Sequence, residues 1–315
     1  MKKFLKVAVI LIGLLVIVIG GFLAFVQIKG IPSYETTEPR NYVEPDSAKL
    51  AQGERLVGML CASCHLNPGT QKLTGKQMTD APAEFGEIHA PNITQDPDYG
   101  IGEYTDSELA YLLRTGIKRN GDYAPAYMVK LPHISDYDME SIIAFLKSNH
   151  RMVAPAKVET IPSKPSILTK ALCNLAWKPF PMPEEKIEVP DSSDRVALGR
   201  YLVVNLDCFP CHSPDFKKVD YLNPENTLGY LSGGNSPLNL EGEVVKTANL
   251  TPHPTGIGNW TEEEFIRTLK TGQRPNGEAL RYPMMPYTRI TDKEASAIFA
   301  YLQSIPPVDN KVERD

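Results

Sequence analysis

A five-residue pattern occurs twice in this chain of 315 residues, as Cys61-Ala62-Ser63-Cys64-His65 and again as Cys208-Phe209-Pro210-Cys211-His212. C-x-x-C-H is the pattern at which c-type haem is attached to a protein. The two thiols can each form a thioether with one vinyl group of the same porphyrin, and the histidine can bring an imidazole nitrogen to the iron. Two copies therefore predict two covalent haem c groups. The expected attachment residues are Cys61, Cys64, Cys208 and Cys211, and the expected iron ligands are His65 and His212.

Two other chemistries also use closely spaced cysteines. A zinc site generally takes four nitrogen or sulfur ligands, whereas each motif offers three, so a fourth would have to come from elsewhere in both copies. A redox-active dithiol needs only the C-x-x-C pair, and the Cys-Phe-Pro-Cys of the second copy is compatible with one. Neither alternative explains why histidine follows both pairs, whereas haem attachment does.

The chain around the two motifs is also repeated, which indicates two related domains. A Gly-x-x-Leu-Val segment precedes both motifs and begins at Gly53 and Gly199. The spacing between the copies is 147 residues at the two motif histidines and 156 residues at Gly100 and Gly256, so the second copy carries nine additional residues between these points. We expect this insertion within residues 230–239, which contain two consecutive glycines.

Each copy is predicted to contain helices joined by irregular loops. The first helix leads into the haem cysteines. A middle helix begins at Thr105 in one copy and at Thr261 in the other, and each threonine is followed three residues later by glutamate, the spacing of a capping box. Gly116 and Gly272 stand where a helix ends with a left-handed residue.

The last helix of each copy has the pattern of an element with one buried face. It begins near Ser135 in the first copy and near Thr291 in the second. Apolar residues then recur at the i, i+3, i+4, i+7 spacing of a helix. They are Met139, Ile142, Ile143 and Leu146, and Ala295, Ile298, Phe299 and Leu302. We expect the first and last helices of each copy to pack together.

Each iron needs a sixth ligand, and a methionine thioether is a known distal ligand of haem c. Met128 and Met284 lie between the middle and last helices and are 156 residues apart, as is the chain around them. This spacing favours Met284 over the adjacent Met285. Methionines also fill gaps in hydrophobic cores, an alternative that explains one methionine more readily than a matched pair. The histidines at 89, 133, 150 and 253 have no matching histidine in the other copy and are not expected to bind iron.

Residues around the proposed ligands are candidates for a supporting role. Backbone carbonyls near Pro68 and Pro214 are candidates for orienting the two proximal imidazoles through their second ring nitrogen. Asn92 and Asn249, each in a repeated Asn-x-Thr segment, are candidates for hydrogen bonding to haem propionates.

The N-terminus predicts a membrane anchor. Lys2, Lys3 and Lys6 precede an apolar run at residues 7–28, in which Gln27 is the one strongly polar residue. These 22 residues are long enough to cross a hydrocarbon core of about 30 Å. A cleaved signal peptide is the alternative, but its apolar region is usually shorter and ends at a small-residue cleavage site. The lysines should stay inside, so the haem domains face outward.

Composition limits the classes of binding partner and indicates how the chain is divided into domains and linkers. Without the three N-terminal lysines, 30 basic residues face 38 acidic ones, a charge of −8 that argues against a nucleic-acid partner. Proline is abundant, with 27 residues, which favours short helices and irregular loops. The predicted division is 1–28 for the cytoplasmic tip and transmembrane anchor, 29–45 for a linker, 46–150 for domain 1, 151–190 for a Pro-rich linker with one helix near 167–177, 191–308 for domain 2 and 309–315 for a tail.

These features together resemble a membrane-anchored dihaem variant of the class I cytochrome c family, over about residues 46–150 and 191–308. The resemblance implies two tandem, all-α class I cytochrome c domains behind one transmembrane helix. It also implies that His65 and Met128 bind one iron and that His212 and Met284 bind the other. The first copy departs from the family pattern, because Val129 follows its methionine where the family commonly has Met-Pro.

The resemblance further implies an electron-transfer protein without enzyme activity of its own. We expect it to relay single electrons in a respiratory or dehydrogenase-linked chain, as a single-pass protein of the inner membrane with its haem domains on the periplasmic side. Expected redox partners are a membrane dehydrogenase, a quinol-oxidising complex, a soluble cytochrome or an oxidase. Two alternatives are a cytochrome subunit of a membrane dehydrogenase complex and a dihaem peroxidase, which would need one iron with an open or displaceable position.

Overall fold

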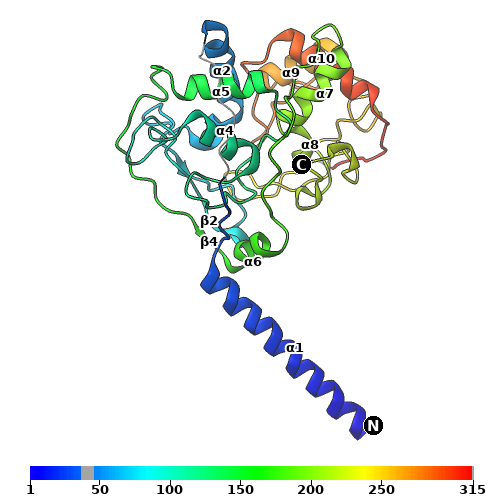
Figure 1. Cartoon of the computed structure of the whole chain (residues 1–315). Coiled ribbons are helices and arrows are strands. Elements are labelled where there is room, and N and C mark those ends of the chain that lie inside the picture. Colours follow the sequence, from blue (N-terminus) through cyan, green and yellow to red (C-terminus); the bar gives the residue numbers. More distant parts are fainter. Residues whose placement is uncertain (37–45, 314–315) are drawn as a thin grey trace.

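The computed structural model describes residues 1–36 and 46–313, which form one long N-terminal helix and a helix-rich body (Figure 1). Residues 37–45 of the predicted linker and 314–315 of the predicted tail lie outside the described part. The longer helices are α1 (Lys2–Lys29), α2 (Ser47–Leu60), α4 (Asp106–Thr115), α5 (Asp136–Leu146), α6 (Ile167–Leu175), α7 (Arg195–Asn205), α9 (Glu262–Thr271) and α10 (Asp292–Ser304). The single-turn helices are α3 (Ala62–His65), α8 (Cys208–Cys211), η1 (Ala83–Phe85), η2 (Phe216–Lys218) and η3 (Pro224–Asn226).

Strand structure in the described residues is limited to short antiparallel pairs. β1 (Lys76–Gln77) pairs with β3 (His89–Ala90), and β2 (Gly86–Glu87) pairs with β4 (Lys164–Pro165). Each named strand is two residues long, so the pairs fasten loops and do not form a layer of the fold.

In each copy, the first and last helices cross at a glycine. A Cβ atom on Gly53 of α2 would lie 1.9 Å from the carbonyl oxygen of Ser141 on α5, and one on Gly199 of α7 would lie 2.0 Å from that of Ala297 on α10. Such distances leave no space for a side chain, so the two backbones touch where the repeated Gly-x-x-Leu-Val segment begins. The predicted packing of first against last helix is confirmed in both copies.

The predicted helix termini are also confirmed. Thr105 and Thr261 cap α4 and α9, and in both cases the complete capping box is present. Gly116 and Gly272 end these helices in the left-handed conformation, with φ of 86° and 80°. The apolar residues predicted for the last helices are buried, apart from Phe299, which is partly exposed and packs against the ring of Phe265.

The additional residues of the second copy lie earlier in the chain than predicted. The N–H of Gly75 donates to the carbonyl of His65, and that of Gly233 donates in the same way to His212. These contacts span 10 residues in the first copy and 21 in the second, so eleven residues are added before Gly233. The prediction of an insertion within 230–239 was wrong, because two residues are lost after Gly233 and only the net difference of nine is visible in the sequence. The added chain contains η2 and η3.

The two copies contact each other through equivalent residues in a reciprocal way. Arg55 on α2 forms an ion pair with Glu294 in the first turn of α10. Tyr201, the counterpart of Arg55 on α7, donates a hydrogen bond of 2.6 Å to Asp138 in the first turn of α5, and Asp138 is the counterpart of Glu294. Two contacts that exchange the copies in this way indicate a local pseudo-twofold relation between them.

The segment 151–190 connects the copies and also packs on the first one. The carbonyl of Met152 accepts from the N–H of Leu73, and that of Val153 from the N–H of Gln95. Val153 is fully buried, so this segment contributes to the core of the first copy. The helix predicted near 167–177 is confirmed as α6, which ends two residues earlier. The division of the chain into domains stays a prediction.

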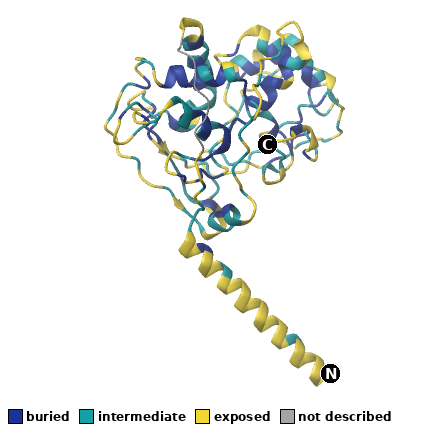
Figure 2. Ribbon diagram, in the orientation of Figure 1, coloured by how far each residue is buried: buried dark blue, intermediate teal, exposed yellow. Residues whose placement is uncertain are grey.

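The N-terminal helix α1 projects from the body with almost all of its surface exposed (Figure 2). It is the one helix in the described residues that is long and apolar enough to cross a membrane, with a mean hydropathy of 3.1 over 18 residues. Its last turn packs against α6, where Val26 is fully buried.

Candidate functional site: two equivalent C-x-x-C-H motifs

Each motif folds into one helical turn directly after the first helix of its copy. In the first copy the motif contains α3, and the N–H of His65 donates to the carbonyl of Cys61 at 2.9 Å. In the second copy it contains α8, and His212 makes the same contact with Cys208 at 2.9 Å. Residues three apart on a helical turn share one side, so the two thiols of each motif can reach one flat group.

Both motif histidines are held by a backbone carbonyl. Nδ1 of His65 lies 2.8 Å from the carbonyl oxygen of Pro91, and Nδ1 of His212 lies 2.8 Å from that of Ala248. A carbonyl can only accept, so the proton is on Nδ1 and Nε2 carries the lone pair that a metal requires. The carbonyls predicted near Pro68 and Pro214 are not the partners, and that prediction was wrong.

The asparagine that follows each of these carbonyls holds the carbonyl-bearing loop in place. The side-chain amide of Asn92 donates to the carbonyls of Ala156 and Val158 at 2.9 and 3.0 Å. That of Asn249 donates to the carbonyl of Val308 at 2.9 Å. Both asparagines are buried and tie the loop to the chain that follows the last helix. Their predicted role toward haem propionates was wrong, because these donors are used within the protein. The repeated Asn-x-Thr segment was the signal that could have located the two carbonyls.

The protonation of the motif side chains suits haem attachment better than dithiol chemistry. Burial lowers the pKa of His65, which favours the neutral imidazole that binds metals. Burial raises the pKa of the Cys61 and Cys208 thiols to about 12, whereas a redox-active dithiol depends on a lowered thiol pKa. Among residues 1–36 and 46–313, no three His, Cys, Asp or Glu side chains gather as a metal-binding group. The residues of each motif therefore fit a haem c group.

The two predicted methionines occupy equivalent loops. The N–H of Met128 donates to the carbonyl of Pro125, and that of Met284 to the carbonyl of Arg281, both at 3.0 Å. Met284 packs against the hydrophobic core, whereas Met285 is 55 % exposed. The loop geometry therefore pairs Met128 with Met284, while their role as iron ligands stays a prediction.

The remaining histidines are engaged elsewhere. His89 pairs with Glu87 at 3.0 Å, and His253 lies 2.9 Å from the hydroxyl of Thr255. His150 accepts a hydrogen bond from the N–H of Met152. His133, the fourth, contacts the second copy, as described next.

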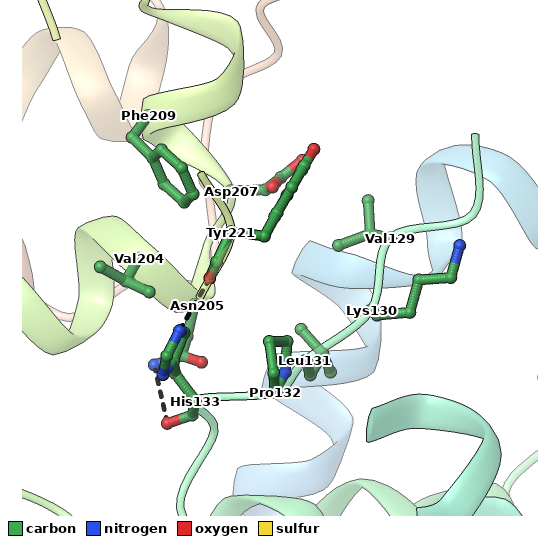
Figure 3. A pocket seen from close by; sticks show the side chains of 10 residues that line it. All are labelled: Val129, Lys130, Leu131, Pro132, His133, Val204, Asn205, Asp207, Phe209 and Tyr221. Atoms are coloured by element: carbon green, nitrogen blue, oxygen red, sulfur yellow. Dashed lines mark hydrogen bonds between the residues drawn. The ribbon is translucent and has the colours of Figure 1, made fainter. Parts of the chain in front are cut away.

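The loop after Met128 lies beside the second motif. A small pocket is lined on one side by residues 129–133 of this loop and on the other by residues of the second copy (Figure 3). The second group includes Phe209, which lies inside the second motif, and Tyr221 from the insertion. Nε2 of His133 lies 2.8 Å from the carbonyl oxygen of Tyr221, and this hydrogen bond joins the loop to the second copy.

A reciprocal contact joins the loop before Met284 to the first copy. Tyr282, two residues before that methionine, donates a hydrogen bond to the carboxylate of Asp80. Each methionine-bearing loop therefore reaches the other copy, and the two candidate sites lie along the interface between the copies.

Comparison with known proteins agrees with these motifs. Residues 196–306 match the family model described as cytochrome c. The chain is 31 % identical over 291 residues to the "Fructose dehydrogenase cytochrome subunit" of Gluconobacter japonicus, an alignment that covers 86 % of this chain and 55 % of that protein. It is 27 % identical over 288 residues to the "Gluconate 2-dehydrogenase cytochrome c subunit" of Pantoea cypripedii, covering 84 % and 62 %.

A third relative has a length close to that of this chain. The "Diheme cytochrome c-type" protein of Cereibacter sphaeroides is 28 % identical over 280 residues, which cover 84 % of this chain and 88 % of that protein. By contrast, the chain spans a little over half the length of the dehydrogenase subunits it matches. Residues 196–306 of this chain are therefore similar to a cytochrome c domain, and the similarity to the diheme relative extends over most of both chains.

Proposed function

We propose that this chain is a membrane-anchored dihaem c-type cytochrome that relays single electrons in a respiratory or dehydrogenase-linked chain. The observation that carries the proposal is the equivalence of the two motifs. Each follows the first helix of its copy, and each histidine has Nδ1 held by a backbone carbonyl at 2.8 Å. The cytochrome c match of residues 196–306 supports the same function for the second copy, and the repeat extends it to the first.

In this proposal, the residues of each motif attach and orient one haem c. Cys61 and Cys64 hold the first group, with His65 and Met128 as axial ligands. The second set is Cys208, Cys211, His212 and Met284. Haem iron supplies the one-electron ferrous–ferric couple. The chain contributes by fixing the imidazoles, by keeping the motif histidines buried and by bringing the two sites to one interface.

A retained α1 would hold the body at the outer surface of the inner membrane, with the N-terminal lysines inside and the haem domains in the periplasm. The contacts of α1 support retention over cleavage. Gln27 accepts a hydrogen bond from Lys170, and the carbonyl of Gly30 accepts one from Asn174, so the end of this helix is part of the folded body.

A second candidate is favoured by the names of the relatives. Two of them are cytochrome subunits of a fructose and a gluconate dehydrogenase. This chain could serve a membrane dehydrogenase in the same way, as a bound subunit that passes electrons onward. The peroxidase alternative is less well supported, because the matched methionines would occupy the position that peroxide needs.

The relay is tested by reduction from a biological donor. Oxidised full-length protein is added to membranes of the source organism that lack this gene, and haem reduction is followed after addition of fructose or gluconate in turn. We expect at least one substrate to reduce both haems faster than heat-treated membranes with the same substrate. Equal rates in both preparations for every substrate would contradict a dehydrogenase-linked relay, and peroxide turnover by the half-reduced protein would favour the peroxidase.

Met284→Ala and Met285→Ala distinguish the two candidate ligands of the second iron. If Met284 is the distal ligand, its removal opens one coordination position, and the reduced protein should bind about one carbon monoxide per chain. Met285→Ala is the matched control and should bind none, because its side chain is largely exposed. The measurement is a carbon monoxide titration followed by optical difference spectra. Binding to the Met285 variant alone would contradict the assignment.

A further inference from the structure

Helix α6 carries apolar side chains on its outer side. Ile167, Ala171 and Leu175 are four residues apart and therefore share one side of the helix, and Leu168 lies next to them. Ile167, Leu168 and Leu175 are 42 %, 43 % and 66 % exposed. This arrangement reverses the usual pattern of a helix on a soluble domain, in which the apolar side faces the core.

The opposite side of α6 faces the body. Thr169 and Cys173 are fully buried, and the hydroxyl of Thr169 donates to the carbonyl of Phe85 at 2.8 Å. The residues that pack inward are therefore small or polar, and the large aliphatic residues at 167, 168 and 175 point away from the protein. The rest of the described chain covers these side chains only in part, which leaves 42–66 % of their surface exposed.

A third side of α6 holds the end of α1. Nζ of Lys170 donates to Oε1 of Gln27 at 3.0 Å, and the amide of Asn174 donates to the carbonyl of Gly30 at 2.9 Å. The two helices meet at the base of the body, where α1 leaves it (Figure 1). The position of α6 relative to a bilayer is therefore fixed by α1.

Helix geometry gives that position. A hydrocarbon core of about 30 Å corresponds to about 20 helical residues at a rise of about 1.5 Å per residue. If the core begins after Lys6, it ends near Val26, and this residue is buried where α1 packs on α6. α6 thus lies at the depth of the outer headgroups.

The charge of this segment suits anionic lipid. Residues 160–183 contain Lys164, Lys170 and Lys178 and no aspartate or glutamate, although the rest of the chain outside its N-terminus is acidic. Within the protein, Lys164 pairs with Glu87 at 2.9 Å, and Lys170 and Lys178 donate hydrogen bonds to uncharged oxygens. An interfacial helix combines apolar side chains that enter the boundary between headgroups and acyl chains with basic residues close to lipid phosphates.

We propose that α6 is a membrane-interface helix that lies in the outer leaflet, with the side chains of Ile167, Leu168 and Leu175 inserted below the headgroups. This inference rests on the proposed anchoring by α1. Together, α1 and α6 hold the body at two points and thereby fix which of its faces is turned to the bilayer and which to soluble partners.

Photo-crosslinking of the full-length protein tests the proposal. p-Benzoylphenylalanine is introduced singly in place of Leu168, Leu175, Leu240 or Leu15, and the purified chains are reconstituted in vesicles of phosphatidylethanolamine and phosphatidylglycerol. After irradiation, adducts are identified by mass spectrometry. Leu240 is the matched control, because it is 57 % exposed on the second copy, and Leu15 reports on α1.

We expect lipid adducts at positions 15, 168 and 175 and none at 240. Lipid adducts at 15 but not at 168 or 175 would overturn the role of α6 and leave the anchor standing. The absence of lipid adducts at 15 would instead refute the anchor. Equal labelling at 175 and 240 would also overturn the proposal, because it would show that the outer side of α6 meets lipid no more than any exposed leucine.

Discussion

Replacing Cys208 and Cys211 by serine is expected to leave the protein with one covalently bound haem instead of two. Each thioether needs a thiol at its own position of the motif, and no other cysteine lies near the second copy's motif in sequence. The corresponding change of Cys61 and Cys64 should also leave one haem, and the combined variant none. Intact-mass spectrometry of protein made in a haem-ligating host counts the groups directly.

Cys173→Ser is the matched control for this experiment. Cys173 is the one cysteine of the chain that lies outside both motifs, and it is fully buried in α6. Its replacement should leave two haems in place. If the protein lacking all four motif cysteines still carried porphyrin mass, or if the unchanged chain carried none, the proposed relay would lose its cofactors.

Gly53→Ala is expected to destabilise the protein far more than Gly58→Ala, although both glycines belong to α2. At Gly53 the new methyl group would lie 1.9 Å from a backbone carbonyl of α5, so the two helices would have to separate. Overpacking of this kind costs about 1–3 kcal/mol, and we expect the upper end because backbone must move. At Gly58 the nearest atoms belong to the flexible side chain of Arg289.

The control should be neutral or slightly stabilising, because alanine favours a helix over glycine by about 1 kcal/mol. The measurement is the free energy of unfolding from denaturant titration, or the shift in Tm where unfolding is irreversible. Gly199→Ala should behave like Gly53→Ala, since its Cβ would lie 2.0 Å from the carbonyl of Ala297. Equal effects of Gly53→Ala and Gly58→Ala would contradict the helix crossing described above.

Features encoded by residues close together in the chain could be predicted from the sequence. The start of α4 depends on Thr105 and Glu108, three residues apart, and its end on Gly116 alone, so the local pattern is sufficient. The same holds for α9 and for the buried stripe of α5. The pairing of Met128 with Met284 needed only the repeat.

Features that depend on contacts between residues far apart in the sequence were not predicted. The carbonyl that holds His65 belongs to Pro91, 26 residues later, and a backbone carbonyl leaves no mark in the sequence. The insertion was misplaced because a gain of eleven residues and a loss of two appear together as nine. The contribution of Val153 to the first copy's core was hidden by the proline-rich composition of its segment, which is typical of a linker.

The reciprocal contacts between the copies differ in chemistry, and they should therefore respond differently to ionic strength. Arg55 and Glu294 retain 27 % and 17 % of their side-chain exposure, so dissolved ions can screen their attraction. Tyr201 and Asp138 are buried, and their hydrogen bond is shielded from the electrolyte. Rising ionic strength is therefore expected to weaken the ion pair between Arg55 and Glu294 more than the hydrogen bond between Tyr201 and Asp138.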